Sequence, residues 1–204
     1  MNNIDSLYTK NNNIKDFAKG YAEYLSFVLK NTDFSELEKL EKMFLEAREN
    51  RQTIFIAGNG GSATTATSMA NDLGFDILKK TGTDLPFKVL ALTDNNSVIT
   101  AISNDVGYEN IFLNQLKIHF RKGDKFIVIS ASGNSGNLIN AVEWVKSQGG
   151  TTVALLGFTG GKLKELCDIS LHFKSVNGEY GPVEDAHLIV NHILAHWFQL
   201  KLKK

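Results

Sequence analysis

Short apolar runs alternate with helix-patterned stretches along most of this chain of 204 residues. Several of the runs are almost continuously apolar, which is typical of strands that are covered on both faces of a sheet. Strands that alternate with helices form parallel sheets, because each connection crosses back over the sheet. The sequence therefore predicts a three-layer α/β sandwich around a five-stranded parallel sheet. The expected strands are residues 53–57, 87–92, 125–130, 151–156 and 168–173.

Helices are expected between these strands and at both ends of the chain. The segment 5–51 is predicted to form two helices, the second of which starts near Asp33 and Glu36, a pair with the spacing of a capping box. The remaining helices are predicted at residues 62–78, 95–106, 109–120, 135–148, 160–166 and 183–204. The length predicts one domain, 1–204, with the helices of 1–51 as an extension.

Composition narrows the class of protein. The chain has 22 basic and 22 acidic residues and no basic block, so it lacks the positive field of a nucleic-acid-binding protein. No apolar run approaches the roughly 20 residues that cross a bilayer, and the first residues do not form a signal-peptide pattern. The single cysteine, Cys167, excludes an internal disulfide. These features predict a cytoplasmic protein that binds neither nucleic acid nor membrane.

Two loops rich in glycine and serine each follow a predicted strand and precede a predicted helix. The first is Gly-Asn-Gly-Gly-Ser at residues 58–62, and the second is Ser-Ala-Ser-Gly-Asn-Ser at residues 130–135. A helix N-terminus offers unpaired backbone N–H groups and the positive end of the helix dipole, which together suit a phosphate. Both loops lie at the carboxyl ends of strands, where open α/β sheets bind ligands. We therefore expect one phosphorylated ligand held from two sides.

The two loops differ in how specific they are. The first has a simpler interpretation as a tight turn with positive φ at Gly60 or Gly61, and it matches neither a Walker loop nor a dinucleotide fingerprint. In the second, Ser135 alone would suffice as a helix N-cap. The additional hydroxyls of Ser130 and Ser132 at the same helix start indicate a polar ligand.

Ionisable side chains gather on two of the predicted helices. The last helix carries Glu184 near its start and three histidines further on. A histidine on an apolar helix is usually a core residue, but three in one helix favour a functional one. His187 and His192 diverge by about 140° around the helix, so one site is not expected to hold both. On the helix after the first loop, Asp72 shares a face with Ser68 and is either a surface carboxylate or a base.

Four segments in this order resemble the sugar isomerase (SIS) domain and, within it, the phosphoheptose isomerase family. They are residues 57–62, 103–108, 129–135 and 184–192, and the resemblance covers nearly the whole chain. It implies an aldose–ketose isomerase that converts sedoheptulose 7-phosphate into D-glycero-D-manno-heptose 7-phosphate through an enediol. It also implies a homotetramer with active sites between subunits, to whose assembly the helices of 1–51 contribute.

The resemblance assigns roles to individual residues. Asp72 and His192 align with the acid–base pair of the family, which the reaction needs because a base must move a carbon-bound proton between C1 and C2 while an acid protonates the carbonyl oxygen. The other implied residues contact the sugar or its phosphate. They are Asn59, Gly60, Gly61, Ser62, Asp105, Ser130, Ala131, Ser132, Ser135 and Glu184.

Three positions depart from the family pattern. Asp72 and Glu184 stand where the family commonly has Glu and Gln, and Ser68 stands where it has His. In some relatives these positions bind zinc together with the residue matching His192. Ser68 is a poor zinc ligand, which leaves Asp72, Glu184 and His192 as the expected set if zinc binds. The same departures leave open another sugar phosphate, and a non-catalytic SIS protein that acts as a sugar-phosphate sensor or a tetrameric adaptor.

Overall fold

The computed structural model describes residues 2–203, in which five parallel strands form one sheet. The strands are β1 (Thr53–Gly58), β2 (Lys88–Ala91), β3 (Lys125–Ser130), β4 (Thr151–Leu156) and β5 (Ile169–His172). Their spatial order is β2-β1-β3-β4-β5. From β1 the chain continues to one edge of the sheet, and from β3 it continues to the other, so the order reverses between β1 and β3. In open α/β sheets such a reversal marks the place where ligands bind.

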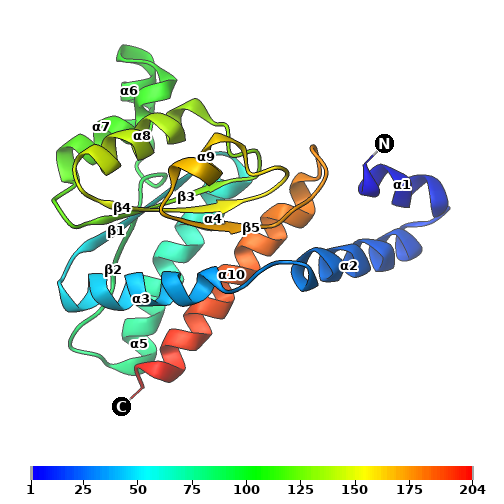
Figure 1. The fold of residues 1–204 in the computed structure, drawn as a ribbon, viewed down its shortest axis with the longest axis horizontal. Helices are drawn as coiled ribbons and strands as arrows, with labels where there is room; N and C mark the ends of the chain where they lie inside the picture. Colours follow the sequence, from blue (N-terminus) through cyan, green and yellow to red (C-terminus); the bar gives the residue numbers. More distant parts are fainter. Residues whose placement is uncertain (1, 204) are drawn as a thin grey trace.

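Helices cover both faces of the sheet, which confirms the predicted three-layer sandwich (Figure 1). One face packs on α3 (Glu36–Glu49), α4 (Gly61–Ala70) and α10 (Tyr180–Lys201) through strand residues such as Ile127 and Ile129. The other face packs on α7 (Ile111–His119), α8 (Gly136–Ser147) and α9 (Gly161–Leu166) through Phe126 and Val128. Side chains alternate between the faces along a strand, so one continuous apolar run supplies two cores. The helix α6 (Asn96–Asp105) and the short 3-10 helix η2 (Tyr108–Asn110), which leads into α7, complete this second layer.

The N-terminal segment holds three helices where two were predicted. They are α1 (Asn3–Lys10), α2 (Ile14–Lys30) and α3, and the first two extend away from the sandwich (Figure 1). The break between α1 and α2 comes from asparagines, because Asn11 ends α1 and the side chain of Asn13 caps α2. The predicted capping box at Asp33 is wrong. Asp33 accepts a hydrogen bond from the Ser35 backbone N–H, and α3 starts only at Glu36.

The helix predicted at 62–78 is helical throughout, but its middle changes type. After α4, the segment η1 (Asn71–Asp76) is a π-helix, and α5 (Ile77–Thr81) follows it. The predicted last helix began at 183 and reached 204, whereas α10 already starts at Tyr180, and residues 1 and 204 lie outside the described residues. Within residues 2–203, no helix is long and apolar enough to cross a membrane.

Candidate active site

The loop between β1 and α4 is shaped by its glycines. Gly60 has φ 55° and ψ −125° at the N-cap of α4, so the predicted positive φ falls on Gly60. A Cβ on Gly58 would lie 2.6 Å from the Ser62 carbonyl oxygen, because the loop folds back closely on the start of the helix. A Cβ on Gly61 would overlap the carboxylate of Glu184. The glycines therefore let Glu184 of α10 lie against the N-terminus of α4, beside the buried Ser62.

Glu184 has an unusual environment for a carboxylate. Burial, together with repulsion from the neighbouring Asp185, raises the pKa of Glu184 above its ordinary value. Asp185 itself accepts a hydrogen bond of 2.6 Å from the Tyr21 hydroxyl of α2. The N-terminal helices thus reach the start of α10, directly beside the candidate site.

The loop between β3 and α8 places its three serine hydroxyls differently. Ser130 Oγ accepts a hydrogen bond from the Gly133 N–H at 3.0 Å, and Ser132 Oγ accepts one from the Asn134 N–H at 3.3 Å. Ser135 occupies the N-cap position of α8, as predicted, but its side chain makes no capping hydrogen bond. The hydroxyls of Ser130 and Ser132 therefore stabilise the conformation of the loop, whereas the Ser135 hydroxyl does not. Ala131 is buried beneath the loop.

The second loop is braced by the turn before α9. Gly133 has φ +66°, and a Cβ there would overlap the Gly160 carbonyl oxygen. The Gly133 carbonyl oxygen accepts a hydrogen bond from the Leu163 N–H at 3.0 Å, and Asn134 Oδ1 accepts one from the Lys162 N–H at 2.9 Å. Backbone thus packs on backbone, and the loop is held from the side opposite to the first loop.

Two asparagines join the two loops. The side chains of Asn59 and Asn137 exchange a pair of hydrogen bonds of 3.0 Å each, and the Tyr108 hydroxyl donates to Asn59 Oδ1 at 2.9 Å. These three residues, with Ser135, line a cavity of about 410 Å³. Asn137 and Tyr108 are not among the site residues predicted from the sequence, although Tyr108 lies in one of the four family segments. Asp105 lies exposed at the end of α6, where its carboxylate accepts a hydrogen bond from Asn104.

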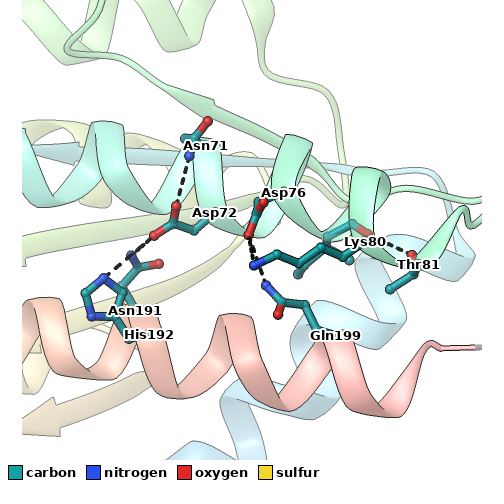
Figure 2. Close-up of polar contacts among 9 residues, drawn as sticks. Asn71, Asp72, Asp76, Lys80, Thr81, Asn191, His192 and Gln199 are labelled. Carbon is teal, nitrogen blue, oxygen red and sulfur yellow. Dashed lines mark hydrogen bonds and ion pairs between the residues drawn. The ribbon is translucent and has the colours of Figure 1, made fainter.

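Asp72 and His192 are brought together by α10 and the π-helix η1 (Figure 2). Asp72 Oδ2 lies 3.9 Å from Nε2 of His192, whose side chain is 56% exposed. The same Oδ2 accepts a hydrogen bond of 2.6 Å from Asn191, and Oδ1 accepts one of 2.9 Å from Asn71. The side chain of Ser68 lies one turn before Asp72 and is partly buried. The predicted acid–base pair is therefore a spatial pair within one chain.

The acid–base pair and the glycine–serine loops lie apart in that chain. Asp72 follows Ser62 by ten residues of helix, a separation of about 15 Å along the axis. Among residues 2–203 there is no group of three histidine, cysteine, aspartate or glutamate side chains placed to hold a metal ion. The expected zinc ligands Asp72, Glu184 and His192 therefore do not form a metal site within a single chain.

His187 belongs to the core. Its side chain is fully buried, with its ring 5.6 Å from that of Phe173, and the backbone of Leu156 is the polar group beside it. Burial lowers the pKa of His187 to about 4, so the ring is neutral at pH 7. The divergence of His187 and His192 around α10 is as the sequence predicted.

Comparison with known proteins identifies the class to which this fold and these loops belong. A family model described as SIS domain matches residues 16–157, so the chain is a SIS-domain protein. It is 39% identical to a phosphoheptose isomerase of Aneurinibacillus thermoaerophilus over 78% of this chain and 77% of that protein. It is 36% identical to that of Sulfurimonas denitrificans over 89% of this chain and 91% of that protein. The chain belongs to the phosphoheptose isomerase family.

Solved structures agree with this assignment. The phosphoheptose isomerase of Neisseria gonorrhoeae superposes with a TM-score of 0.75 at 28% identity, over 89% of this chain and 94% of that chain. The one from Francisella tularensis gives a TM-score of 0.78 at 24% identity, over 92% and 96% of the two chains, and that likeness establishes the fold. The family resemblance read from the four sequence segments is confirmed.

Proposed function

We propose that this protein is an aldose–ketose isomerase that interconverts sedoheptulose 7-phosphate and D-glycero-D-manno-heptose 7-phosphate. The observation that carries the proposal is the pairing of Asp72 with His192, 3.9 Å apart, in a chain that also presents two braced glycine–serine loops. The relatives that match this chain over most of their length are named phosphoheptose isomerases, which supports the same reaction.

The chemistry divides between the two kinds of site. The loops would bind the phosphate through serine hydroxyls and the first-turn N–H groups of α4 and α8. Both oxygens of Asp72 accept hydrogen bonds from amides, which hold the carboxylate in place and suit Asp72 to carry the proton between C1 and C2. The exposed imidazole of His192 would then exchange the proton of the carbonyl oxygen. The intermediate is the enediol, which returns to the ketose when C1 is reprotonated and gives the aldose when C2 is reprotonated.

A complete active site needs the two loops and the acid–base pair to lie closer together than they do within one chain. We therefore propose the homotetramer that the family resemblance implies, in which the loops of one subunit face Asp72 and His192 of another. An apolar groove of about 610 Å³ between α3 and α10 supports self-association. Ile193, Trp197 and Leu200 line it with side chains 42%, 50% and 75% exposed, and His192 lies on the same groove. Exposed apolar surface of this kind marks protein contacts.

Zinc is a separate proposal on which no step above depends. If it binds, the expected ligands Asp72, Glu184 and His192 must come together across subunits, because a single chain does not group them. Metal analysis of the purified protein after dialysis tests it, with the Asp72→Asn variant as the comparison.

The alternative function is that of a sugar-phosphate sensor or adaptor that keeps the fold without catalysis. It is favoured by Ser68, which stands where the family has a histidine. Deuterium exchange at the reacting carbon, which is C1 of the ketose and C2 of the aldose, separates the alternatives. The isomerase incorporates deuterium from D₂O into sedoheptulose 7-phosphate, whereas a sensor is stabilised by the same compound without exchange. An adaptor shows neither effect.

Substitutions test the roles of the two sites. We expect His192→Ala to abolish turnover while the thermal shift caused by sedoheptulose 7-phosphate is retained, because it removes acid–base chemistry and leaves the loops intact. Ser132→Ala should mainly raise KM. His119→Ala, at an exposed histidine of α7 outside this groove, is the matched control and should keep wild-type turnover. Full activity of His192→Ala would refute the assignment.

A further inference from the structure

Asn191 is an unexpected residue in the interior of this fold. Its side chain is completely buried in α10, next to the exposed His192. The amide nitrogen donates the 2.6 Å hydrogen bond to Asp72 Oδ2, but the amide oxygen has no hydrogen-bond partner in the described part of the chain. A buried acceptor without a partner costs about 1–3 kcal/mol. An apolar side chain of similar size would avoid this cost, so packing does not explain the amide.

The π-helix explains how the amide reaches Asp72. In η1 each turn is wider than in an α-helix, which changes the direction of the side chains that follow α4. The helix α10 is hydrogen-bonded to this segment at two places, which Figure 2 shows side by side. Asn191 donates to Asp72, and Gln199 donates to Asp76 at 3.1 Å. Asp76 also forms an ion pair of 2.6 Å with Lys80. Both contacts are hydrogen bonds from a side-chain amide to a carboxylate, but only the one from Asn191 is accepted by the carboxylate that the reaction uses.

We propose that Asn191 is a positioning residue, which fixes the Asp72 carboxylate in the orientation that the isomerase reaction requires. It holds Oδ2 on the side of His192 and so leaves Oδ1 on the exposed side, where Asn71 is its partner. Two amide donors on different elements define the plane of the carboxylate, which a single donor does not. The inference rests on the proposed function, because it assigns Asp72 to the proton transfer.

The competing explanation is a purely structural clamp between α10 and η1. The hydrogen bond between Gln199 and Asp76 provides the matched control, because Gln199→Met removes the same kind of hydrogen bond without touching Asp72. We expect Asn191→Leu to lower kcat about 10- to 100-fold with little change in KM, since misplacing a reacting group has effects of this size. Its melting temperature should equal or exceed that of the wild type. Gln199→Met should leave kcat within about twofold of the wild type.

A double-mutant cycle shows whether the effect passes through Asp72. In an Asp72→Asn background, which has little residual activity, Asn191→Leu should cause no further loss of kcat. The inference is overturned if Asn191→Leu has wild-type kcat, if Gln199→Met loses as much, or if the two losses in the cycle simply multiply.

A crystal structure of Asn191→Leu separates this inference from the proposed function. We expect the Asp72 carboxylate to rotate away from His192 while η1 and α10 keep their positions. If the wild type turned over no sugar phosphate, the proposed function would fail, and the structure of the variant would still decide on the positioning. An unchanged Asp72 carboxylate overturns the inference in either case.

Discussion

At the scale of single residues, burial decides what an ionisable side chain does. His187 and His192 lie on one helix, five residues apart, yet one is sealed in the core and the other is exposed beside a carboxylate. The sequence predicted their divergence from the helical period, but the period does not say which of the two is buried. Asn191 escaped prediction for a related reason, because only the packing of α10 on η1 gives a buried amide a carboxylate to hold.

His187 should make the protein sensitive to acid. Its pKa falls from 6.5 in the unfolded chain to about 4 in the folded one, so the unfolded state binds the proton first as the pH drops. The stability that depends on the neutral ring is complete above pH 6.5 and is lost progressively toward pH 4, where the loss amounts to about 3 kcal/mol.

Urea unfolding of wild type and His187→Leu between pH 7 and pH 4 measures this effect. The difference in unfolding free energy should shift by about 3 kcal/mol in favour of the variant as the pH falls through this range. His119→Leu, an exposed position on α7, is the control and should follow the wild type. Parallel curves for wild type and His187→Leu would contradict the prediction.

At the scale of elements, the strands were predictable and the helical irregularities were not. β3 and β4 match the predicted 125–130 and 151–156 residue for residue, because both lie inside the sheet and are buried along almost their whole length. The edge strand β2 is shorter than predicted, since it has a neighbour on one side only. The π-helix has no signature in composition, and it is this segment that directs Asp72 toward α10.

Two glycines near the start of α8 should differ in how much an added methyl group lowers the stability of the protein. Gly133 combines φ +66° with a Cβ position that overlaps the Gly160 backbone, which cannot move aside as a side chain would. We expect Gly133→Ala to lower the unfolding free energy by about 2–3 kcal/mol. The thermal shift caused by sedoheptulose 7-phosphate should be weakened as well.

Gly136, three residues later in the first turn of α8, is the matched control. A Cβ there would meet nothing within 4 Å. Gly136→Ala should therefore be neutral or stabilising by up to about 1 kcal/mol, through helix propensity alone. Thermal unfolding of both variants measures the contrast in stability. Equal behaviour of the two would show that the bracing of the loop by the α9 turn is unimportant.

At the scale of the whole molecule, α10 lies along the continuous helical segment formed by α4 and η1, and the site residues follow one another along it. Gly61 meets Glu184 near the loops, Asp72 meets Asn191 further along, and Asp76 meets Gln199 last. The sequence already placed Asp72 ten residues beyond Ser62 on one predicted helix, but it did not show which residues of α10 lie opposite each level. That separation makes assembly part of the proposed catalysis, since a second subunit must bring loops to the acid–base pair.

A charge in the groove between α3 and α10 should therefore abolish both assembly and activity. Ile193 is exposed in this groove, and Ile193→Glu would bury a carboxylate in any contact formed there, at a cost that an interface of this kind does not recover. We expect the wild type to sediment as a tetramer and the variant as a smaller species with little turnover. Ile118→Glu, on an exposed apolar side chain of α7 outside the groove, should keep both tetramer and activity. Analytical ultracentrifugation and the isomerase assay on the same samples measure the two effects together. An active Ile193→Glu monomer would show that one chain suffices for catalysis, and the loops and the acid–base pair would then have to serve one substrate across a single subunit.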